Sequence, residues 1–475
     1  MLGGLKNSIL WALARDYGGQ IIGFTISICL ARLLTPEDFG LVGISLEFIQ
    51  MLKILTSFGL NEALIQDQQA SSTTFNSVFV VNCVLGGSIA VLLFVFAPHA
   101  AHFYGREKLI LLIRALAVIF LMQSINGVQI SIFQKKMKFK ALAFRDLIAQ
   151  SVSGGAAVGA AFMGYGVYAL VLQHLLANIL KTILLWSASE WKPQWQVKKV
   201  ELMRLKTFAS YSFFGQALAR MIQEAYVLFI GKIFTPATLG FFSRANSFSK
   251  LIVQNSSNSL KSVLFPALSK IQKDDKAFMN AFYRAIMLAS VLAVFLSAWA
   301  FMNGEFLILN LFGAQWLPTV PMFQWLMVRG VSTPISAIII SSMLAKGMAK
   351  ENFKFGNLRR TLSLLPLLAL LARDIDVFLK VFALAAIMSA LVSIYAAQVE
   401  LKASLLKLVL PWVLAMSVSL AYVNWIAVIF EHNDLSSFLL KSMTFVLFFF
   451  SFMGVFYHKS FASGLKQVLV VGIRK

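Results

Sequence analysis

Runs of about twenty apolar residues recur along the whole chain, separated by short polar breaks. A run of that length is what an α-helix needs to cross the hydrocarbon core of a bilayer. Of the 475 residues, 59% are hydrophobic and only 13% are charged, and the mean hydropathy is +0.78. This composition excludes a soluble globular domain. We therefore expect an all-α polytopic membrane protein.

The apolar runs predict fourteen transmembrane helices. They are expected at residues 8–34, 40–61, 75–97, 109–133, 143–162, 165–188, 207–233, 240–265, 281–302, 319–343, 356–373, 376–398, 405–430 and 437–457. Because no small-residue cleavage site follows a short apolar core at the start, we expect the first run to be a retained helix. Cys29 and Cys83 lie inside apolar runs and indicate neither a disulfide framework nor a metal site.

Lysine and arginine are concentrated in alternate loops, which the positive-inside rule assigns to the cytoplasm. The lysine-rich loops are 134–142, 189–206, 270–276 and 346–354. The intervening loops, which contain Glu37, Glu305 and Asp434, are poor in cations. We therefore expect a multi-pass membrane protein with both termini in the cytoplasm. Although the net charge is +22, the cations form no single patch with aromatic residues, so no nucleic-acid partner is expected.

A ten-residue motif occurs twice at an offset of 200 residues, as ARLLTPEDFG at 31–40 and GKIFTPATLG at 231–240. Thr, Pro and Gly are identical between the copies at 35/235, 36/236 and 40/240. Each copy lies between two apolar runs. Since proline follows one run and glycine opens the next, the motif predicts a tight turn between two helices.

The repeat predicts two lobes related by an axis along the membrane normal, because six predicted helices precede the second copy and both copies enter the membrane in the same direction. We expect one six-helix lobe at 1–200, a second at 201–400, and two additional helices with a cytoplasmic tail at 401–475. Parallel repeats of this kind place a substrate path at the interface of the repeats.

Several predicted helices carry ionisable residues, each of which costs about 2.5–3.5 kcal/mol at the bilayer centre unless it meets a partner or water. Helical spacing aligns polar residues on the eighth span, and the positions 200 residues earlier form a similar stripe on the second span. The stripe on the eighth span consists of Ser247, Lys250, Gln254, Ser257 and Lys261. The stripe on the second span consists of Glu47, Gln50, Ser57 and Asn61, and only Ile54 interrupts it. Asp16 and Gln20 on the first span match Gln216 and Arg220 on the seventh, which continues to Glu224. We expect these faces to line one central hydrophilic cavity.

Lys53, Arg244 and Lys250 have no obvious acidic partner nearby in the sequence and predict a cationic substrate site. Arg220 and Glu224, four residues apart, could instead satisfy each other as a structural pair.

The neighbours Arg15–Asp16 and Arg145–Asp146 point in different directions on a helix and need not pair with each other. They could cap or bridge neighbouring helices instead. Gly155 and Gly159, small residues four apart, predict a helix-packing contact.

Signals of enzymatic chemistry are weak. Gly164-Tyr165-Gly166 followed by Ala169 imitates a dinucleotide motif but has no strand before it. The sequence contains no nucleophile elbow, no P-loop and no metal-spaced histidine pair. We expect no enzyme activity, no catalytic residue, no cofactor and no metal.

Three segments, ARLLTPEDFGLVGI, LFIGKIFTPATLGFFSRANSF and VLFPALSKI, resemble the Wzx-type polysaccharide flippases, the O-antigen and exopolysaccharide exporters of the MOP (MATE-like) superfamily. The resemblance covers the chain to about Gly347 and fades in the last four spans. Two features depart from the family pattern. Glu224 stands where members often have Asp, and Ala237-Thr238 replace the acidic pair Glu37-Asp38 in the second copy.

The resemblance implies a flippase of the bacterial inner membrane. It would move an undecaprenyl-pyrophosphate-linked oligosaccharide from the cytoplasmic to the periplasmic leaflet by ion-coupled alternating access of two lobes. The partners it implies are this lipid-linked substrate, membrane lipids, polysaccharide polymerase and export proteins, and H⁺ or Na⁺. The basic residues would then bind the pyrophosphate, the neutral polar residues the sugars, and one acid the coupling ion. The basic residues are Lys53, Arg220, Arg244 and Lys250. The neutral polar residues are Gln20, Gln50, Gln254 and Ser257, and the candidate acids are Asp16, Glu47 and Glu224.

Three other functions compete with this interpretation. A MATE-type cation-coupled multidrug exporter would need an acidic, aromatic-lined cavity, and the lysines and arginines on the stripes argue against it. A membrane enzyme such as a polysaccharide polymerase or acyltransferase would need a large external loop, and the external loops are short. A structural scaffold would not need paired polar stripes within the membrane.

Overall fold

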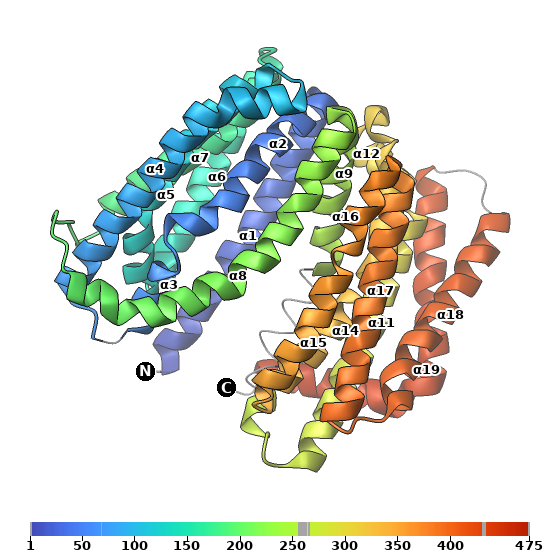
Figure 1. Ribbon diagram of the computed structural model, residues 1–475. Helices are drawn as coiled ribbons and strands as arrows, with labels where there is room; N and C mark the ends of the chain where they lie inside the picture. The colour runs from blue at the N-terminus through green and yellow to red at the C-terminus, as the bar shows by residue number, and fades with distance from the viewer. Residues whose placement is uncertain (1, 68, 255–263, 265–266, 430–433, 474–475) are drawn as a thin grey trace. The chain divides into compact units, whose positions relative to one another are not determined.

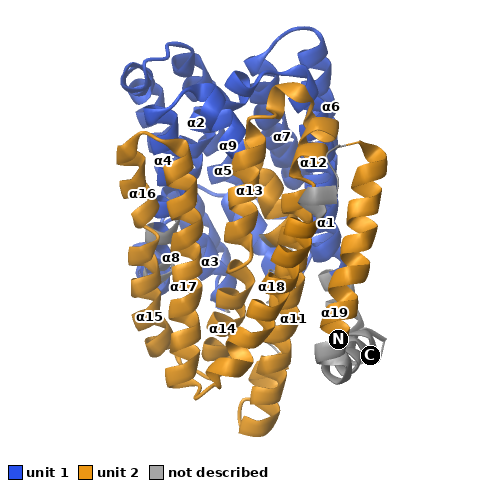
Figure 2. Cartoon of the chain, turned by 90° about the vertical axis from the view of Figure 1, so that its right-hand side faces the viewer, with its two compact units in different colours: residues 1–243 blue, residues 244–475 orange. Residues whose placement is uncertain are grey.

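The computed structural model describes residues 2–67, 69–254, 264, 267–429 and 434–473. Within these ranges the chain consists of α-helices with short 3₁₀ and π segments, and contains no β-strand. The chain forms two compact units, residues 1–243 and 244–475 (Figure 2). The predicted lobe boundary between residues 200 and 201 stays a prediction.

The first unit is built from eight helices and the start of a ninth (Figure 1). They are α1 (Leu2–Leu33), α2 (Pro36–Lys53), α3 (Leu60–Gln66), α4 (Ser72–Tyr104), α5 (Lys108–Lys135), α6 (Phe139–Phe162), α7 (Val167–Ser187), α8 (Lys199–Ile233) and the beginning of α9 (Pro236–Ser249), with the 3₁₀ segment η1 (Ile54–Thr56) after α2. Helix α4 packs along α5, and α6 contacts both α1 and α7.

The second unit contains the end of α9 and the helices that follow it. They are the π segment η2 (Lys250–Gln254), α11 (Asp275–Met302), α12 (Gly304–Phe312), η3 (Ala314–Trp316), α13 (Thr319–Gly330), α14 (Thr333–Ala345), α15 (Ala349–Leu362), α16 (Leu365–Ala369), η4 (Leu370–Ala372), α17 (Ile375–Glu400), α18 (Leu405–Ile429) and α19 (Leu435–Ile473).

Eight helical segments of the described chain are long and apolar enough to cross a membrane. These are α4, α5, α7, α11, the consecutive pair α13–α14, α17, α18 and α19. The remaining predicted spans overlap α1, α2, α6, α8, α9 and the pair α15–α16. Residues 255–263 and 265 of the predicted span 240–265 lie outside the described residues. The all-α membrane fold is therefore confirmed, and the predicted fourteen spans are consistent with it.

Three predicted loops contain helix. Helix α8 begins at Lys199 rather than at residue 207, and α3 and α12 lie in segments predicted as loops. The segment KVELMRLK at 199–206 is rich in strong helix formers but lacks a long apolar run, so a criterion based on membrane-spanning length passes over it.

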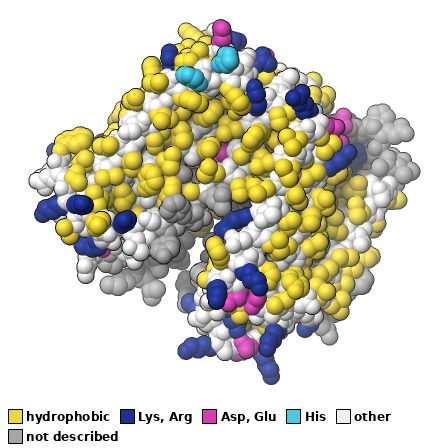
Figure 3. All heavy atoms as spheres, viewed as in Figure 1, with side chains coloured by type: hydrophobic (Ala, Val, Ile, Leu, Met, Phe, Trp, Pro, Cys, Tyr) yellow, Lys and Arg dark blue, Asp and Glu magenta, His cyan; other side chains and the backbone are white. Residues whose placement is uncertain are grey.

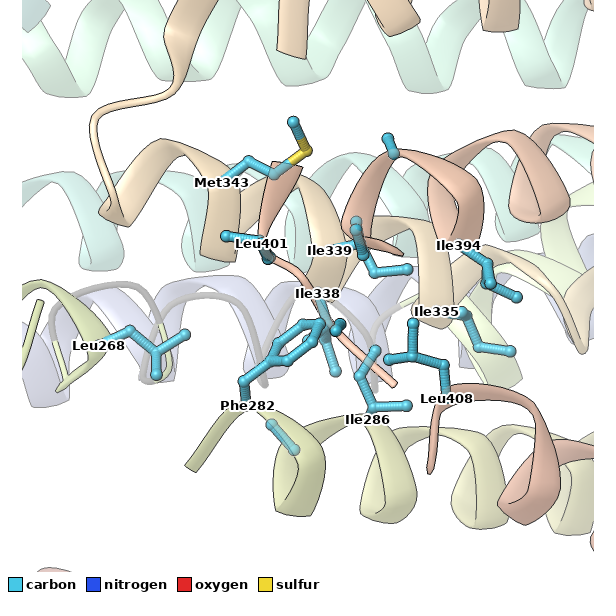
Figure 4. Packing of buried hydrophobic residues seen from close by; sticks show 14 of the residues in the cluster. Leu268, Phe282, Ile286, Ile335, Ile338, Ile339, Met343, Ile394, Leu401 and Leu408 are labelled. Atoms are coloured by element: carbon cyan, nitrogen blue, oxygen red, sulfur yellow. The ribbon is translucent and has the colours of Figure 1, made fainter. Parts of the chain in front are cut away.

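A core of aliphatic and aromatic side chains joins α11, α14, α17 and α18 in the second unit (Figure 4). Phe282 and Ile286 of α11 meet Ile335 of α14 and Leu408 of α18 there, all buried. The two last helices, α18 and α19, also pack on α11. They are joined to each other by a hydrogen bond in which the Tyr422 hydroxyl of α18 donates to the carbonyl oxygen of Lys441 of α19 at 3.0 Å. Helices α18 and α19 are therefore an integral part of this unit.

The outer surface is largely apolar (Figure 3). Val91 and Val95 on α4 are each 64% exposed, and Leu384 and Tyr395 on α17 are 55% and 58% exposed. Soluble monomers rarely expose so many large apolar side chains. This surface suits contact with lipid chains.

The two Thr-Pro turns touch each other reciprocally within the first unit. A Cβ added at Gly40 would overlap the carbonyl oxygen of Pro236, and a Cβ added at Gly240 would overlap that of Pro36. Each position therefore needs glycine so that the backbones can approach. A contact in which each copy makes the same approach to the other is the mark of local two-fold symmetry, so the repeat seen in the sequence has a structural counterpart.

The two turns share one cap, because the N–H of Asp38 donates to the Thr35 hydroxyl at 3.3 Å as the N–H of Thr238 does to the Thr235 hydroxyl, and they differ in the further contacts of the threonine. In the first copy the Thr35 N–H and hydroxyl donate to the Asp38 carboxylate at 3.1 and 2.8 Å. In the second copy the Thr238 N–H donates to the Thr235 hydroxyl at 3.2 Å. The acidic residue that the second copy lacks is thus not required to form the turn.

Candidate substrate and ion-coupling residues

Several equivalent positions of the two copies have similar burial. Positions 44 and 244 are buried, with Ile44 at 1% and Arg244 at 7% exposure, whereas Gln50 and Lys250 are both exposed. The polar stripe continues with Glu47, which is half-buried, and Ser247, which is exposed. Lys250 thus belongs to an accessible face, and Arg244 lies on another side of the same helix.

Both second helices of the repeat lose α-helical geometry near a candidate lysine. Helix α2 ends at Lys53 and continues as the 3₁₀ segment η1, while α9 ends at Ser249 and the π segment η2 begins at Lys250. Lys53 and Lys250 are both exposed. Segments of π-helix inside α-helices are rare and occur frequently at functional sites. The π segment therefore marks Lys250, whereas a 3₁₀ turn at the end of a helix, as after Lys53, is common.

Arg244 lies between two aromatic rings of the second unit. Its guanidinium carbon is 5.2 Å from the ring centroid of Phe312 and 5.3 Å from that of Trp316. Both rings are fully buried, at 1% and 0% exposure. Such cation–π contacts are strongest when water is excluded. The guanidinium is thus held inside the unit.

The candidate acids lie in three different helices of the first unit. Asp16 on α1 is exposed and accepts a hydrogen bond from the Arg15 Nε at 3.0 Å. Glu47 on α2 and Glu224 on α8 are half-buried, as is Gln20 on α1. The structure does not distinguish one of these acids as the ion-coupling group.

Three predicted positions lie outside what the structure describes. The side chains of Arg220 on α8 and Gln254 on η2 are outside the described part, and so is the whole of Ser257. The predicted alternative of an Arg220–Glu224 pair therefore stays a prediction.

A charged cluster on α6 and α7 includes Lys181, which the sequence analysis did not select. Arg145 and Asp146 do pair, with Nη2 and Oδ1 2.7 Å apart, because the long guanidinium stem can fold back along the helix. Arg15 and Asp16 pair in the same way. Asp146 and Arg145 also act electrostatically on Lys181 of α7, which in turn acts on His174. Lys181 sits inside a predicted span, so the criterion applied to the other spans would have selected it.

The predicted packing role of Gly155 and Gly159 on α6 is wrong for the described chain. A Cβ added at either position would meet nothing within 4 Å. Gly154 is the close contact instead, because a Cβ there would overlap the side chain of Ile26 on α1. The small-residue pattern was correct for the helix but was assigned to the wrong face.

Among the described residues, no group of three or more histidine, cysteine, aspartate or glutamate side chains could hold a metal ion.

Residues 29–321 match the model of the family described as "Polysaccharide biosynthesis protein". The chain belongs to this family. Two relatives align with the chain over about two thirds or more of their length. The succinoglycan biosynthesis transport protein ExoT of Rhizobium meliloti is 27% identical over 70% of this chain and 68% of its own. The lipopolysaccharide biosynthesis protein WzxC of Escherichia coli is 22% identical over 73% of this chain and 70% of its own.

Solved structures of two transporters share the fold. The lipid II flippase MurJ in an inward closed conformation superposes with a TM-score of 0.77 at 15% identity, over 95% of this chain and 99% of MurJ. An inward-facing multidrug resistance MATE family transporter of the MOP superfamily gives 0.64 at 13% identity, over 81% of this chain and 94% of its own. The resemblance to Wzx-type MOP flippases is confirmed, and the relatives are transport and biosynthesis proteins, as expected for a chain that is not an enzyme.

Proposed function

We propose that the chain is a flippase that moves an undecaprenyl-pyrophosphate-linked oligosaccharide from the cytoplasmic to the periplasmic leaflet of the bacterial inner membrane. The observation that carries this proposal is membership of the polysaccharide biosynthesis family together with a fold shared with a lipid flippase. Polysaccharide polymerase and export proteins are the partners that would use the product. Both termini lie in the cytoplasm in this proposal, as the loop charges favour.

The chemistry of the substrate fits the exposed lysines. A sugar pyrophosphate is a multiply charged polar head on a very apolar tail, so its carrier needs cations on an accessible polar face. Lys53 and Lys250 are exposed at helix irregularities, and each can act as a point charge for a phosphate. Gln50 beside Lys53 and Gln20 on α1 can replace water around the sugars.

The structure describes the side chain of Arg244 but not that of Arg220. Arg244 would take part in substrate binding only in a conformation that releases it from Phe312 and Trp316. Arg220, Gln254 and Ser257 remain candidates from the sequence alone.

Ion coupling requires an acid whose cation affinity differs between two arrangements of the lobes, since only a differential affinity shifts a two-state equilibrium. Asp16, Glu47 and Glu224 are the candidates, with H⁺ or Na⁺ as the ion. Asp16 is already paired with Arg15, so an arriving cation would compete with that guanidinium.

The competing function is a MATE-type multidrug exporter, which the fold alone would also permit. Lys53 on α2 and Lys250 on η2 are exposed cations, each in its own unit, whereas Glu47 is half-buried, and this favours an anionic substrate.

The test is transport by the purified chain in proteoliposomes loaded with a fluorescent polyprenyl-diphosphate oligosaccharide. We expect transfer between leaflets that Lys53→Ala plus Lys250→Ala abolishes and that Glu305→Ala, in a predicted external loop, leaves unchanged. Transfer that is equally fast with the double variant would remove the two lysines from the proposed site. Transfer of a cationic dye in place of the diphosphate substrate would favour the multidrug function.

A further inference from the structure

The start of α8 lines a cavity of about 440 Å³ in the first unit. Its other walls come from the segment between η1 and α3 and from Val81 of α4, so three separate parts of the chain build it. Phe58 and Phe213 lie side by side there, with ring centroids 4.6 Å apart. None of the proposed substrate or ion-coupling residues lines this cavity.

The backbone at Phe58 adopts an uncommon left-handed conformation that places its ring at the cavity. Phe58 has a φ of 45° and Gly59 a φ of 76°, both in the left-handed region, which a bulky side chain rarely adopts. A Cβ at Gly59 would overlap the carbonyl oxygen of Ala209 on α8, so glycine permits this close approach. The Phe58 side chain is nevertheless 41% exposed. Strain that leaves an aromatic ring exposed beside a cavity suggests a binding role.

The cavity also presents two cations. Lys199 and Lys206 line it and are both exposed. They lie seven residues apart, which puts them on one face of α8. Their long flexible stems allow both ammonium groups to approach one phosphate.

Arg204 pairs with two acids near the start of α8, whereas Glu62 on α3 is exposed. Arg204 contacts Asp67 at 2.7 Å and Glu201 at 2.9 Å. Lys138 donates to Glu190 at 3.0 Å, and that hydrogen bond is the main cause that lowers the pKa of the Glu190 carboxyl from its ordinary value. Within the described residues neither Lys199 nor Lys206 forms an ion pair, so their charge is available to an anion.

Exposed apolar residues place the cavity at the level of lipid headgroups. Trp195, Val197, Val200 and Met203 are 77%, 54%, 80% and 58% exposed, and they alternate with lysines before and along the first turns of α8. A helix with apolar and lysine-rich faces lies in the membrane interface. The positive-inside rule assigns this segment to the cytoplasmic side.

We propose that this cavity binds an anionic glycerophospholipid of the cytoplasmic leaflet. The phosphate lies between Lys199 and Lys206, and the glycerol end of an acyl chain packs against Phe58, Phe213 and Met203. The combination of two cations with an apolar wall selects this ligand. A free inorganic phosphate leaves the wall unfilled, and a zwitterionic lipid brings its own cation against the lysines.

The test is native mass spectrometry of the purified full-length chain during titration with phosphatidylglycerol, and with phosphatidylethanolamine of the same acyl chains. We expect preferential binding of phosphatidylglycerol, weakened by about tenfold or more in Lys199→Gln plus Lys206→Gln. The matched control Lys192→Gln plus Lys198→Gln removes the same charge outside the cavity and should retain wild-type binding. Ser210→Phe, which fills the cavity but keeps both lysines, should also lose the preference. Thermal melting checks that each variant is folded.

An equal loss of phosphatidylglycerol binding in the cavity variant and in its matched control would overturn the proposal. The whole basic segment, rather than the cavity, would then attract the anionic lipid. Retained binding in Ser210→Phe would likewise exclude the cavity. A folded cavity variant with wild-type affinity for phosphatidylglycerol would exclude the lysines. Tighter binding of a polyprenyl diphosphate than of phosphatidylglycerol would overturn the phospholipid assignment and make the cavity a docking site for a diphosphate lipid.

Discussion

Two basic residues of α9 and η2, six positions apart, have opposite surroundings. Lys250 is exposed at the start of a π segment, and Arg244 is buried between Phe312 and Trp316. The sequence assigned both to one cationic site. Their burial separates an accessible charge from one that holds elements of the second unit together, and the two residues should respond differently to mutation.

Lys250→Ala should abolish most transport while leaving the protein folded. A hydrogen bond to a charged group contributes about 1.5–3 kcal/mol, so the rate should fall by about tenfold or more. Lys250→Arg should keep part of the activity because it keeps the charge. The measurement is polymer export together with protein level in membranes. Wild-type export from Lys250→Ala would remove this residue from the site.

Arg244→Ala should lower stability as well as export. The cation–π contacts with two buried rings contribute about 2 kcal/mol when desolvated, and the deleted side chain also leaves space beside Phe312. The check is thermal melting of the purified chain in detergent, with Lys250→Ala as the exposed control. Unchanged melting of Arg244→Ala would contradict a structural role, and its loss of export would then indicate direct binding of substrate.

At the scale of elements, the reciprocal approach of the two Thr-Pro turns is the most constrained contact. Gly40→Ala or Gly240→Ala would push a methyl group into the carbonyl oxygen of the opposite proline. Overpacking of this kind costs about 1–3 kcal/mol, so both variants should melt earlier and the turns should move apart.

The matched control is Gly155→Ala on α6, where the added methyl group meets open space. It should melt like the wild type, or slightly higher because alanine favours helix. Comparable melting of Gly40→Ala and Gly155→Ala would show that the turns do not touch as described.

Long apolar runs and the Thr-Pro repeat were sufficient to predict the principal helices, because hydrophobic length and turn residues are local signals. Helices α3 and α12 and the first turns of α8 were missed, since short amphipathic helices carry no such run. The surroundings of the candidate site were less predictable. The aromatic partners of Arg244 come from positions 312 and 316, and no local pattern links residues so distant. The exposure of Gln50 on α2 and of Lys250 on η2 agrees with the polar faces that helical spacing indicates.

At the scale of the whole molecule, the chain belongs to a polysaccharide biosynthesis family and shares its fold with a solved lipid flippase, while the proposed specificity for sugar and coupling ion would depend on side chains from several helices. If one of the candidate acids couples transport to protons, its amide variant should bind substrate but lose dependence on the pH gradient. Asp16→Asn, Glu47→Gln and Glu224→Gln can be compared in proteoliposomes with an imposed gradient. A gradient dependence retained by all three variants would exclude these acids as the proton-coupling group.

The most direct test is the amount and leaflet of lipid-linked oligosaccharide in cells that lack this gene, complemented with the wild type or with Lys250→Ala. The proposed function predicts that the precursor accumulates on the cytoplasmic leaflet and surface polymer disappears, and that only the wild type restores export. Unchanged precursor and polymer, together with increased sensitivity to cationic drugs, would contradict the flippase and favour a multidrug exporter.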